Sequence, residues 1–162
     1  MERENIVYQP IGIIHSPLKT IEGVPIQPCG AKGIQGKVEI RREYTAGLNG
    51  LSEFSHIILI YHLHLSKGHS LAVVPFLDNI PHGLFATRAP KRPNPIGISL
   101  VKLIRIEDTS IVVENIDIVD GTPLLDIKPY VGLFDSVENE KIGWYEGQIN
   151  RAEITKSDSR FK

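Results

Sequence analysis

Short alternating apolar segments constrain the fold of this chain more than any other feature of its sequence. Eleven prolines and 14 glycines cut the 162 residues into short pieces. Most of these pieces alternate Val or Ile with polar residues, which is the two-residue period of a half-buried strand. The pattern predicts seven strands: residues 11–15, 37–41, 56–64, 71–76, 84–87, 98–106 and 111–119.

Two further segments complete the expected architecture. Residues 42–54 predict a short helix, because Tyr44, Leu48 and Leu51 follow one another at helical spacing. The polar residues 107–110 suit a hairpin between the last two strands. Consecutive strands without regular strand-helix alternation favour a mainly β barrel or sandwich over a doubly wound sheet. The polar tail from residue 156 predicts disorder.

Composition narrows the class of protein. Eighteen Lys and Arg against 19 Asp and Glu give a formal charge of -1, so any nucleic-acid site must be a local patch. The single cysteine, Cys29, excludes an intramolecular disulfide and a Cys-rich zinc module. Residues 1–6 lack the basic and apolar stretches of a signal peptide, and the longest apolar run, residues 57–61, is too short to span a membrane. We expect a soluble cytoplasmic protein.

A proline-rich stretch, residues 86–99, is the first candidate for chemistry. Prolines at 90, 93 and 95 hold the backbone in a rigid extended path. Because proline has no N–H, such a loop offers carbonyl oxygens to a cationic or amine ligand. Five basic residues and no acid lie between residues 85 and 106: Arg88, Lys91, Arg92, Lys102 and Arg105. The alternative, a stiffened connection with solvated charges, is equally open.

The second candidate stretch is residues 117–130. Asp120, Gly121, Thr122 and Pro123 have the composition of a turn. After the turn Asp126, Lys128 and Tyr130 alternate, so an extended backbone would place their side chains on one face. The alternative for Asp126 and Lys128 is a simple ion pair on an edge strand.

A metal site and a nucleophilic cysteine have little support. His62 and His64 would project to the same side of a strand, but no third or fourth ligand at workable spacing is evident. We therefore expect no metal, and a histidine lining a small-molecule pocket fits better. Cys29 has no obvious base beside it. Motifs of P-loop, Rossmann and α/β-hydrolase enzymes do not occur.

The order and wording of six segments resemble the TsaA-like, or YaeB-like, family of S-adenosylmethionine-dependent tRNA methyltransferases. The matching segments are residues 10–17, 23–27, 50–56, 83–88, 92–99 and 120–130. The strings Arg-Pro-Asn-Pro-Ile-Gly and Asp-Gly-Thr-Pro-Leu-Leu-Asp-Ile-Lys-Pro-Tyr are the most specific. The resemblance implies a compact antiparallel β-barrel with one or two short helices over residues 1–135, followed by a partly flexible extension over residues 136–162.

The resemblance also implies an activity, a cofactor and an assembly. Family members form homodimers, bind S-adenosylmethionine near the dimer interface and methylate N6 of N6-threonylcarbamoyladenosine at position 37 of tRNA, beside the anticodon. The implied cofactor-binding residues are Pro25, Ile26, Gln27, His64, Leu65, Arg88, Leu100, Asp120, Gly121, Thr122 and Pro123. Ile26 and Leu65 depart from the family's frequent Arg and Gln, which favours either backbone contacts there or a slightly different pocket.

Chemistry assigns the remaining roles as hypotheses. Methylating a weakly nucleophilic exocyclic amine needs alignment with the sulfonium and acceptors for developing positive charge. Asn94 and the loop carbonyls are suitable acceptors, and Asp126 is a candidate proton acceptor. Tyr130 is expected to stack on or hydrogen-bond the base, while Arg92 and Lys128 are expected to pair with the threonyl carboxylate.

Two rival interpretations stay open. One is a non-catalytic module that binds S-adenosylmethionine or RNA. The other is a methyltransferase for another RNA or a small molecule, because the roughly 30 residues after 131 cannot form the C-terminal domain of longer family members.

Overall fold

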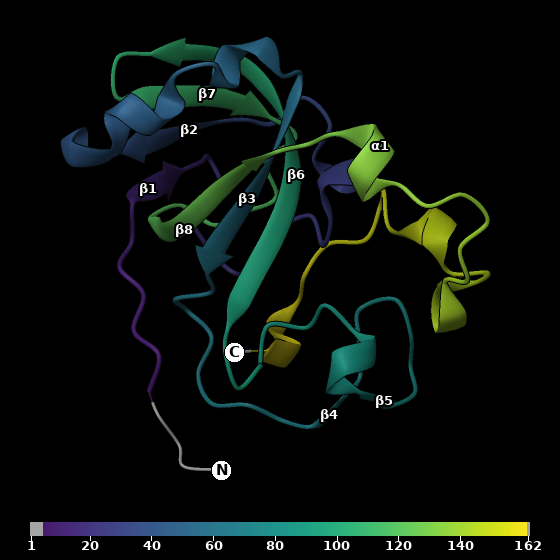
Figure 1. The fold of residues 1–162 in the computed structure, drawn as a ribbon. Helices are drawn as coiled ribbons and strands as arrows, with labels where there is room; N and C mark the ends of the chain where they lie inside the picture. Colours follow the sequence, from purple (N-terminus) through teal and green to yellow (C-terminus); the bar gives the residue numbers. More distant parts are fainter. Residues whose placement is uncertain (1–4, 162) are drawn as a thin grey trace.

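Six antiparallel strands close into a barrel (Figure 1). The computed structural model describes residues 5–161. Around the barrel the strands follow the order β1 (Gly12–His15), β2 (Gln35–Ile40), β7 (Ser110–Glu114), β6 (Ile96–Glu107), β3 (His56–His62) and β8 (Thr122–Pro129), and β8 pairs with β1 to close it. The expected mainly β barrel is confirmed. The expectation about a signal peptide rests partly on residues 1–4, which lie outside the described residues.

The two-residue alternation places one row of side chains inside the barrel. Ile57 and Leu59 of β3 are fully buried, and Val101 of β6 and Ile111 of β7 meet them in the core. In β3 and β6 the residues that alternate with these face outward. The core therefore fills the barrel, and ligands must bind at its ends or on its outer face.

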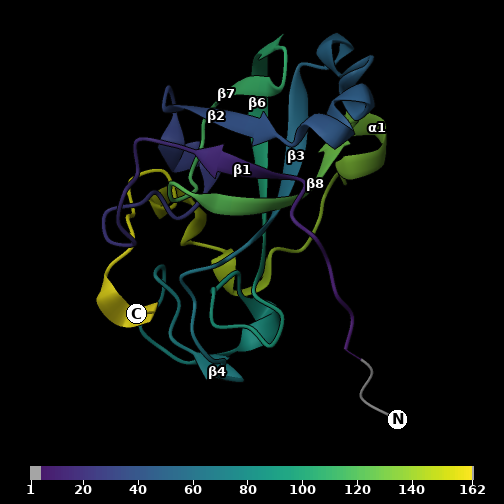
Figure 2. The same ribbon diagram turned by 90° about the vertical axis from the view of Figure 1, so that its left-hand side faces the viewer.

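A smaller lobe lies at the end of the barrel where β3 stops (Figures 1 and 2). It contains the two-stranded sheet of β4 (Ala72–Val73) and β5 (His82–Gly83). The remaining elements are short helices: η1 (Pro28–Ala31), η2 (Arg42–Leu48), η3 (Leu51–Glu53), η4 (Leu84–Ala86), α1 (Gly132–Asp135), η5 (Gly143–Tyr145), η6 (Ile149–Arg151) and η7 (Ser159–Phe161). None of the helices within residues 5–161 has the length and apolarity needed to cross a membrane.

Two predicted elements were wrong in type. Residues 84–87 form a 3-10 turn instead of a strand, because the Thr87 N–H bonds to the Leu84 carbonyl at 3.0 Å. A four-residue apolar run is too short for its period to separate these conformations. The predicted helix over residues 42–54 is two 3-10 segments, η2 and η3, divided at Gly50, whose φ of +78° no right-handed helix accepts.

Two other predicted strands are present but shorter than predicted. The strand predicted over residues 71–76 is reduced to β4. The one predicted over residues 111–119 ends at Glu114, because Asn115 has a φ of +67°. The expected hairpin is confirmed: Glu107 pairs with Ser110, and Asp108 supplies the left-handed turn conformation with a φ of +47°.

The end of the described chain packs against the loop of residues 23–25. We call residues 156–161 the C-terminal strap. The Ser157 N–H bonds to the Val24 carbonyl at 2.8 Å, and the Gly23 N–H bonds to the Ser157 carbonyl at 2.9 Å. Phe161 is buried, with its ring 5.0 Å from that of Phe76. The polar composition predicted disorder here, but backbone pairing and one aromatic anchor hold the strap in place.

Candidate cofactor cavity

A cavity of about 350 Å³ opens between the end of the barrel and the smaller lobe. This volume lies at the lower end of the range of small-molecule sites. Its walls come from the loop of residues 21–26, the ends of β3 and β6, the proline-rich loop, residues 117–122 and the C-terminal strap. Segments distant in sequence therefore meet at one hollow.

Most of the expected cofactor residues converge on this cavity. Six of them line its wall: Pro25, Ile26, His64, Leu65, Arg88 and Thr122. A seventh, Gln27, accepts a hydrogen bond of 2.8 Å from Arg88 Nη1. Burial and neighbouring His62 lower the pKa of His64. His64 is therefore uncharged at neutral pH and does not repel a cationic ligand.

Hydrogen bonds on the side away from the cavity hold the turn that contains Thr122. The Asp120 carboxylate accepts hydrogen bonds from the Ser16 N–H at 3.0 Å and from Lys19 Nζ at 2.8 Å. Lys19 is the main cause that lowers the pKa of Asp120. Gly121 adopts a φ of +77° and donates its N–H to the Ile14 carbonyl at 2.9 Å. Asp120, Gly121 and Pro123 are not among the cavity-lining residues, so they position Thr122 from outside the wall.

Arg92 lines the cavity, but one of its guanidinium nitrogens is hydrogen-bonded to backbone carbonyl oxygens of the protein. Its Nη1 lies 2.9 Å from the Thr87 carbonyl oxygen, 3.3 Å from that of Ala89 and 3.5 Å from that of Leu84. Its guanidinium carbon also lies 5.8 Å from the centre of the exposed Phe85 ring. Arg92 thus clamps the backbone that carries Arg88.

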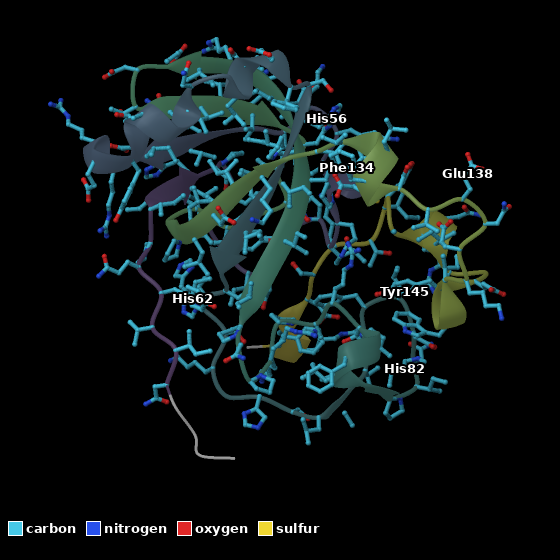
Figure 3. The ribbon with its side chains drawn as sticks, viewed as in Figure 1. His56, His62, His82, Phe134, Glu138 and Tyr145 are labelled. Carbon is cyan, nitrogen blue, oxygen red and sulfur yellow. The ribbon has the colours of Figure 1, made fainter. Side chains whose placement is uncertain are left out.

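Aromatic stacking supports the same loop from the other side. Trp144 Nε1 donates to the Ala86 carbonyl at 2.7 Å, and its ring stacks against those of His82, at 4.6 Å, and Tyr145, at 3.9 Å. Figure 3 shows the His82 and Tyr145 side chains near each other beside the lobe. Arg88 is therefore presented by a loop fixed on both sides.

The residues expected at the substrate do not reach the cavity of their own chain. Asn94 is exposed on the proline-rich loop and is not among the cavity-lining residues. Asp126 and Lys128 share a face of β8 as expected and form an ion pair of 2.8 Å, which raises the pKa of Lys128. Asp126 and Lys128 pair with β3 on one side only, because β1 pairs with residues 122–124 of β8, so the edge-strand ion pair describes their arrangement.

Tyr130 lies at the opposite end of the barrel. Its N–H bonds to the His56 carbonyl at 3.1 Å, whereas His62 pairs with the cavity-lining Ile96. Figure 3 shows His56 and His62 at the two ends of β3. Six residue steps along a strand separate them by about 20 Å. Asp126 borders a second, open hollow of about 760 Å³ near η2.

Leu100 is not among the residues that line the cavity. It belongs to a row of outward-facing apolar residues, which we call the apolar strip: Ile58 and Ile60 of β3 with Ile96, Ile98 and Leu100 of β6. Ile96, Ile98 and Leu100 expose 43%, 54% and 38% of their surface. Ile96 and Ile98 also line the cavity, so the strip continues into its mouth.

Sequence reasoning missed one acid on the cavity wall. Asp117 accepts a hydrogen bond of 2.6 Å from Ser99 Oγ, which in turn lies 2.9 Å from the Tyr61 hydroxyl. Burial raises the pKa of Asp117 to about 6. The available signal was the position of an acid between two apolar residues, Ile116 and Ile118, both of which are buried.

No candidate metal centre emerges among the described residues. Within residues 5–161, no group of three or more His, Cys, Asp or Glu side chains is arranged to hold a metal ion. Cys29 is exposed as a free thiol.

Comparison with known proteins identifies the family. Residues 13–136 match the family model described as the tRNA-methyltransferase O N-terminal domain. The chain belongs to the tRNA-methyltransferase O family. The crystal structure of tRNA-methyltransferase O from Pseudomonas aeruginosa superimposes on 87% of this chain with a TM-score of 0.74 and 34% identity, and 63% of that chain is covered.

Relatives of this tRNA-methyltransferase O family member carry two kinds of description. A probable S-adenosyl-L-methionine-binding protein of Pyrococcus abyssi is 53% identical over 96% of this chain and 85% of its own. The human tRNA (adenine(37)-N6)-methyltransferase is 33% identical over 99% of this chain but only 39% of its own. The chain therefore spans well under two thirds of the human enzyme.

Proposed function

We propose that this chain transfers the methyl group of S-adenosylmethionine to N6 of N6-threonylcarbamoyladenosine at position 37 of tRNA, in the cytoplasm. The observation that carries the proposal is the convergence on one cavity of six residues that the family resemblance assigns to the cofactor. The resemblance to enzymes described as tRNA (adenine(37)-N6)-methyltransferases supports the position of the methylated base.

The chemistry of the cavity fits a cationic cofactor. S-adenosylmethionine supplies an activated methyl group on a positively charged sulfur. The wall offers the carboxyl of Asp117, the uncharged ring of His64 and apolar surface from Ile26, Leu63 and Phe76. Arg88, joined to Gln27, is the donor pair available to polar groups of the nucleoside or to the cofactor carboxylate.

Substrate recognition needs cations for the threonyl carboxylate and a surface for RNA. Lys128 and the basic proline-rich loop supply the cations that we assign to these roles, with Asn94 as an acceptor for the amine. Tyr130 supplies a ring for the base. Arg92 keeps a substrate role in this proposal only through the part of its guanidinium that does not clamp the loop.

We further propose that two copies of the chain form the working unit. The apolar strip is an exposed strand surface of the kind that proteins cover in an assembly. It runs into the cavity mouth at Ile96 and Ile98, so a second copy seated on the strip also closes the cavity. Cross-strand pairing puts Asp126 beside Ile60 and Lys128 beside Ile58, on the same face.

This arrangement gives the distant residues a role. A partner that covers the strip carries its own Lys128 and Tyr130 toward the cavity that they cannot reach within one chain, with Asp126 as the ion-pair partner that holds Lys128. Leu100 then contacts the partner or the cofactor held between the copies. The proposed site is complete only in the dimer.

The decisive experiment is methyl transfer to two matched tRNAs. One carries threonylcarbamoyladenosine at position 37 and the other carries unmodified adenosine. We expect methylation of the first, detected by nucleoside mass spectrometry, and poor methylation of the second. Equal methylation of both contradicts the carboxylate contact. Cofactor binding without transfer to either supports the non-catalytic module.

A second experiment tests the dimer. Sedimentation should give twice the 18.1 kDa mass of one chain. Leu100→Asp should shift the protein to monomer and abolish transfer, whereas Ile154→Asp, a change at an exposed apolar residue outside the strip, should leave the mass unchanged. A wild-type monomer with full activity contradicts the shared site.

A further inference from the structure

Asp117 occupies a distinctive position in the cavity wall. It lies in the connection between β7 and β8, and its side chain is partly buried between the buried residues Ile116 and Ile118. The side chain still contributes to the surface of the cavity where the cofactor residues meet. Hydrogen bonds hold its orientation, because Ser99 Oγ donates to its Oδ1 at 2.6 Å.

A relay of hydroxyl groups fixes this arrangement. The Tyr61 hydroxyl lies 2.9 Å from Ser99 Oγ, and burial together with the Asp117 charge raises the pKa of Tyr61 far above its ordinary value. Tyr61 therefore stays protonated and donates to Ser99, which leaves the Ser99 hydrogen for Asp117. The chain of donors ends on the carboxylate and stabilises its charged form.

The titratable groups that line the cavity together with Asp117 come from several elements. Tyr61 comes from β3, His64 from the loop that follows it, and Arg88 and Arg92 from the proline-rich loop. His64 is uncharged at neutral pH, and the charge of Arg88 lowers the pKa of Asp117 against the larger effect of burial. Asp117 is the one carboxyl group on this wall within the described residues.

We propose that Asp117 is a catalytic residue that accepts the N6 proton during methyl transfer. The inference rests on the proposed function. It replaces Asp126, which lies outside the cavity of its own chain, as the proton acceptor. A carboxyl group with a pKa near 6 is a stronger base than an ordinary aspartate and is still ionised at neutral pH.

The charges change in the order that this step needs. The positive sulfur bound in the same cavity lowers the pKa of Asp117 and keeps it ionised before transfer. As the lone pair of N6 forms its bond to the methyl carbon, the sulfur–methyl bond breaks and its electron pair stays on sulfur. The positive charge thus leaves sulfur and develops on N6. The N6 proton then passes to the Asp117 carboxylate, and the electron pair of the N–H bond returns to nitrogen.

The test compares cofactor binding and turnover across pH. For the wild-type dimer, the single-turnover rate of methylation of threonylcarbamoylated tRNA should rise with pH as one group loses its proton. We call this rise the pH limb. Asp117→Asn should bind S-adenosylmethionine within about threefold of wild type by calorimetry. It should lose about 10²- to 10⁴-fold in transfer rate, together with the pH limb. Asp126→Asn should keep the limb.

The following outcomes contradict the assignment of Asp117 as the proton acceptor. Asp117→Asn with the wild-type rate, or with the limb unchanged, overturns the assignment. Lost cofactor binding in a folded Asp117→Asn protein also overturns it, since the carboxylate would then be a counter-ion to the cofactor. A wild-type protein that binds cofactor but methylates no tRNA defeats the proposed function and the assignment together.

A second variant covers the case in which Asp117→Asn does not fold. Ser99→Ala removes the donor that stabilises the carboxylate, so the pKa of Asp117 rises and the limb should move to higher pH. A limb that stays in place in a folded, active Ser99→Ala protein overturns the proposal. A purely structural role for the relay would lower stability without moving the limb.

Discussion

Arg92 donates a hydrogen bond of 2.9 Å from its Nη1 to the carbonyl oxygen of Thr87, five residues earlier in the chain. Together with the contact to Ala89 at 3.3 Å, this bond ties the proline-rich loop into a fixed shape. Arg88 lies between these two carbonyls in sequence. The conformation that presents Arg88 to the cavity therefore depends on Arg92.

Replacing Arg92 should affect the cofactor as well as the substrate. Arg92→Ala leaves the carbonyls of Thr87 and Ala89 without their charged donor, at a cost of about 1.5–3 kcal/mol. We expect at least a tenfold weaker affinity for S-adenosylmethionine, measured by calorimetry. Arg92→Lys keeps the charge but lacks the forked guanidinium group, so it should recover only part of the affinity for S-adenosylmethionine. Unchanged cofactor affinity in Arg92→Ala would restrict Arg92 to the substrate.

The buried carboxyl of Asp117 should make stability depend on pH. The folded chain holds its proton up to a pKa of about 6, whereas an unfolded chain releases it near the ordinary value of 3.8. Between these values the folded state binds more protons, so stability falls as pH rises. Above the window the cost is constant, on the order of 2–3 kcal/mol.

Asp117→Asn carries no such cost. Its melting temperature should exceed that of wild type by about 5 °C at pH 7.5 and match it near pH 4. Asp126→Asn, which changes an acid in a surface ion pair, should show no comparable gain. A difference between Asp117→Asn and wild type that does not vary from pH 4 to 7.5 would contradict the desolvated carboxyl.

The anchor of the C-terminal strap should matter for cofactor binding. Phe161 is 6% exposed and packs with Val73, Leu84 and Phe76 while lining the cavity. Phe161→Ala removes that wall and should cost about 3 kcal/mol. The matched change Phe134→Ala, at a residue 82% exposed and outside the cavity, should be neutral. Thermal melts with and without cofactor compare the two, and equal cofactor-induced shifts would remove the strap from the site.

A single methyl group at Gly97 should disturb the relay. A Cβ at this position would clash with the Tyr61 ring. The ring must move, and its hydrogen bond to Ser99 is lost. Gly97→Ala should therefore destabilise the protein by about 2 kcal/mol or more and weaken cofactor binding. In Gly47→Ala the added Cβ meets nothing within 4 Å, so this control should leave both properties intact.

The barrel was predictable because its strands alternate. Ile57, Leu59 and Tyr61 fall on the inner face at every second position, and the period by itself predicts β3. Residues 84–87 lack the length to show a period, so their 3-10 turn was predicted as a strand. The broken helix near Gly50 depends on one left-handed φ that residue spacing does not reveal.

The cavity was predictable only in part, and for a different reason. Arg88 and Gln27 were expected at the cofactor from family motifs, and the structure joins them. Asp117 acquires its properties from Ser99 and Tyr61, which are distant in sequence and meet only in the folded barrel. The distance between Tyr130 and the cavity likewise comes from the register of β3 and β8, which no local pattern specifies.

The C-terminal strap also determines when, during synthesis of the chain, the cavity is completed. Ser157 and Phe161 complete a cavity whose other walls begin at Ile21. A nascent chain with its barrel already folded still lacks one wall until Phe161 has left the ribosome. The cavity therefore gains its last wall only after the strap is made, and ribosome-stalled chains that end before residue 156 should hold S-adenosylmethionine less tightly than chains that extend past residue 161.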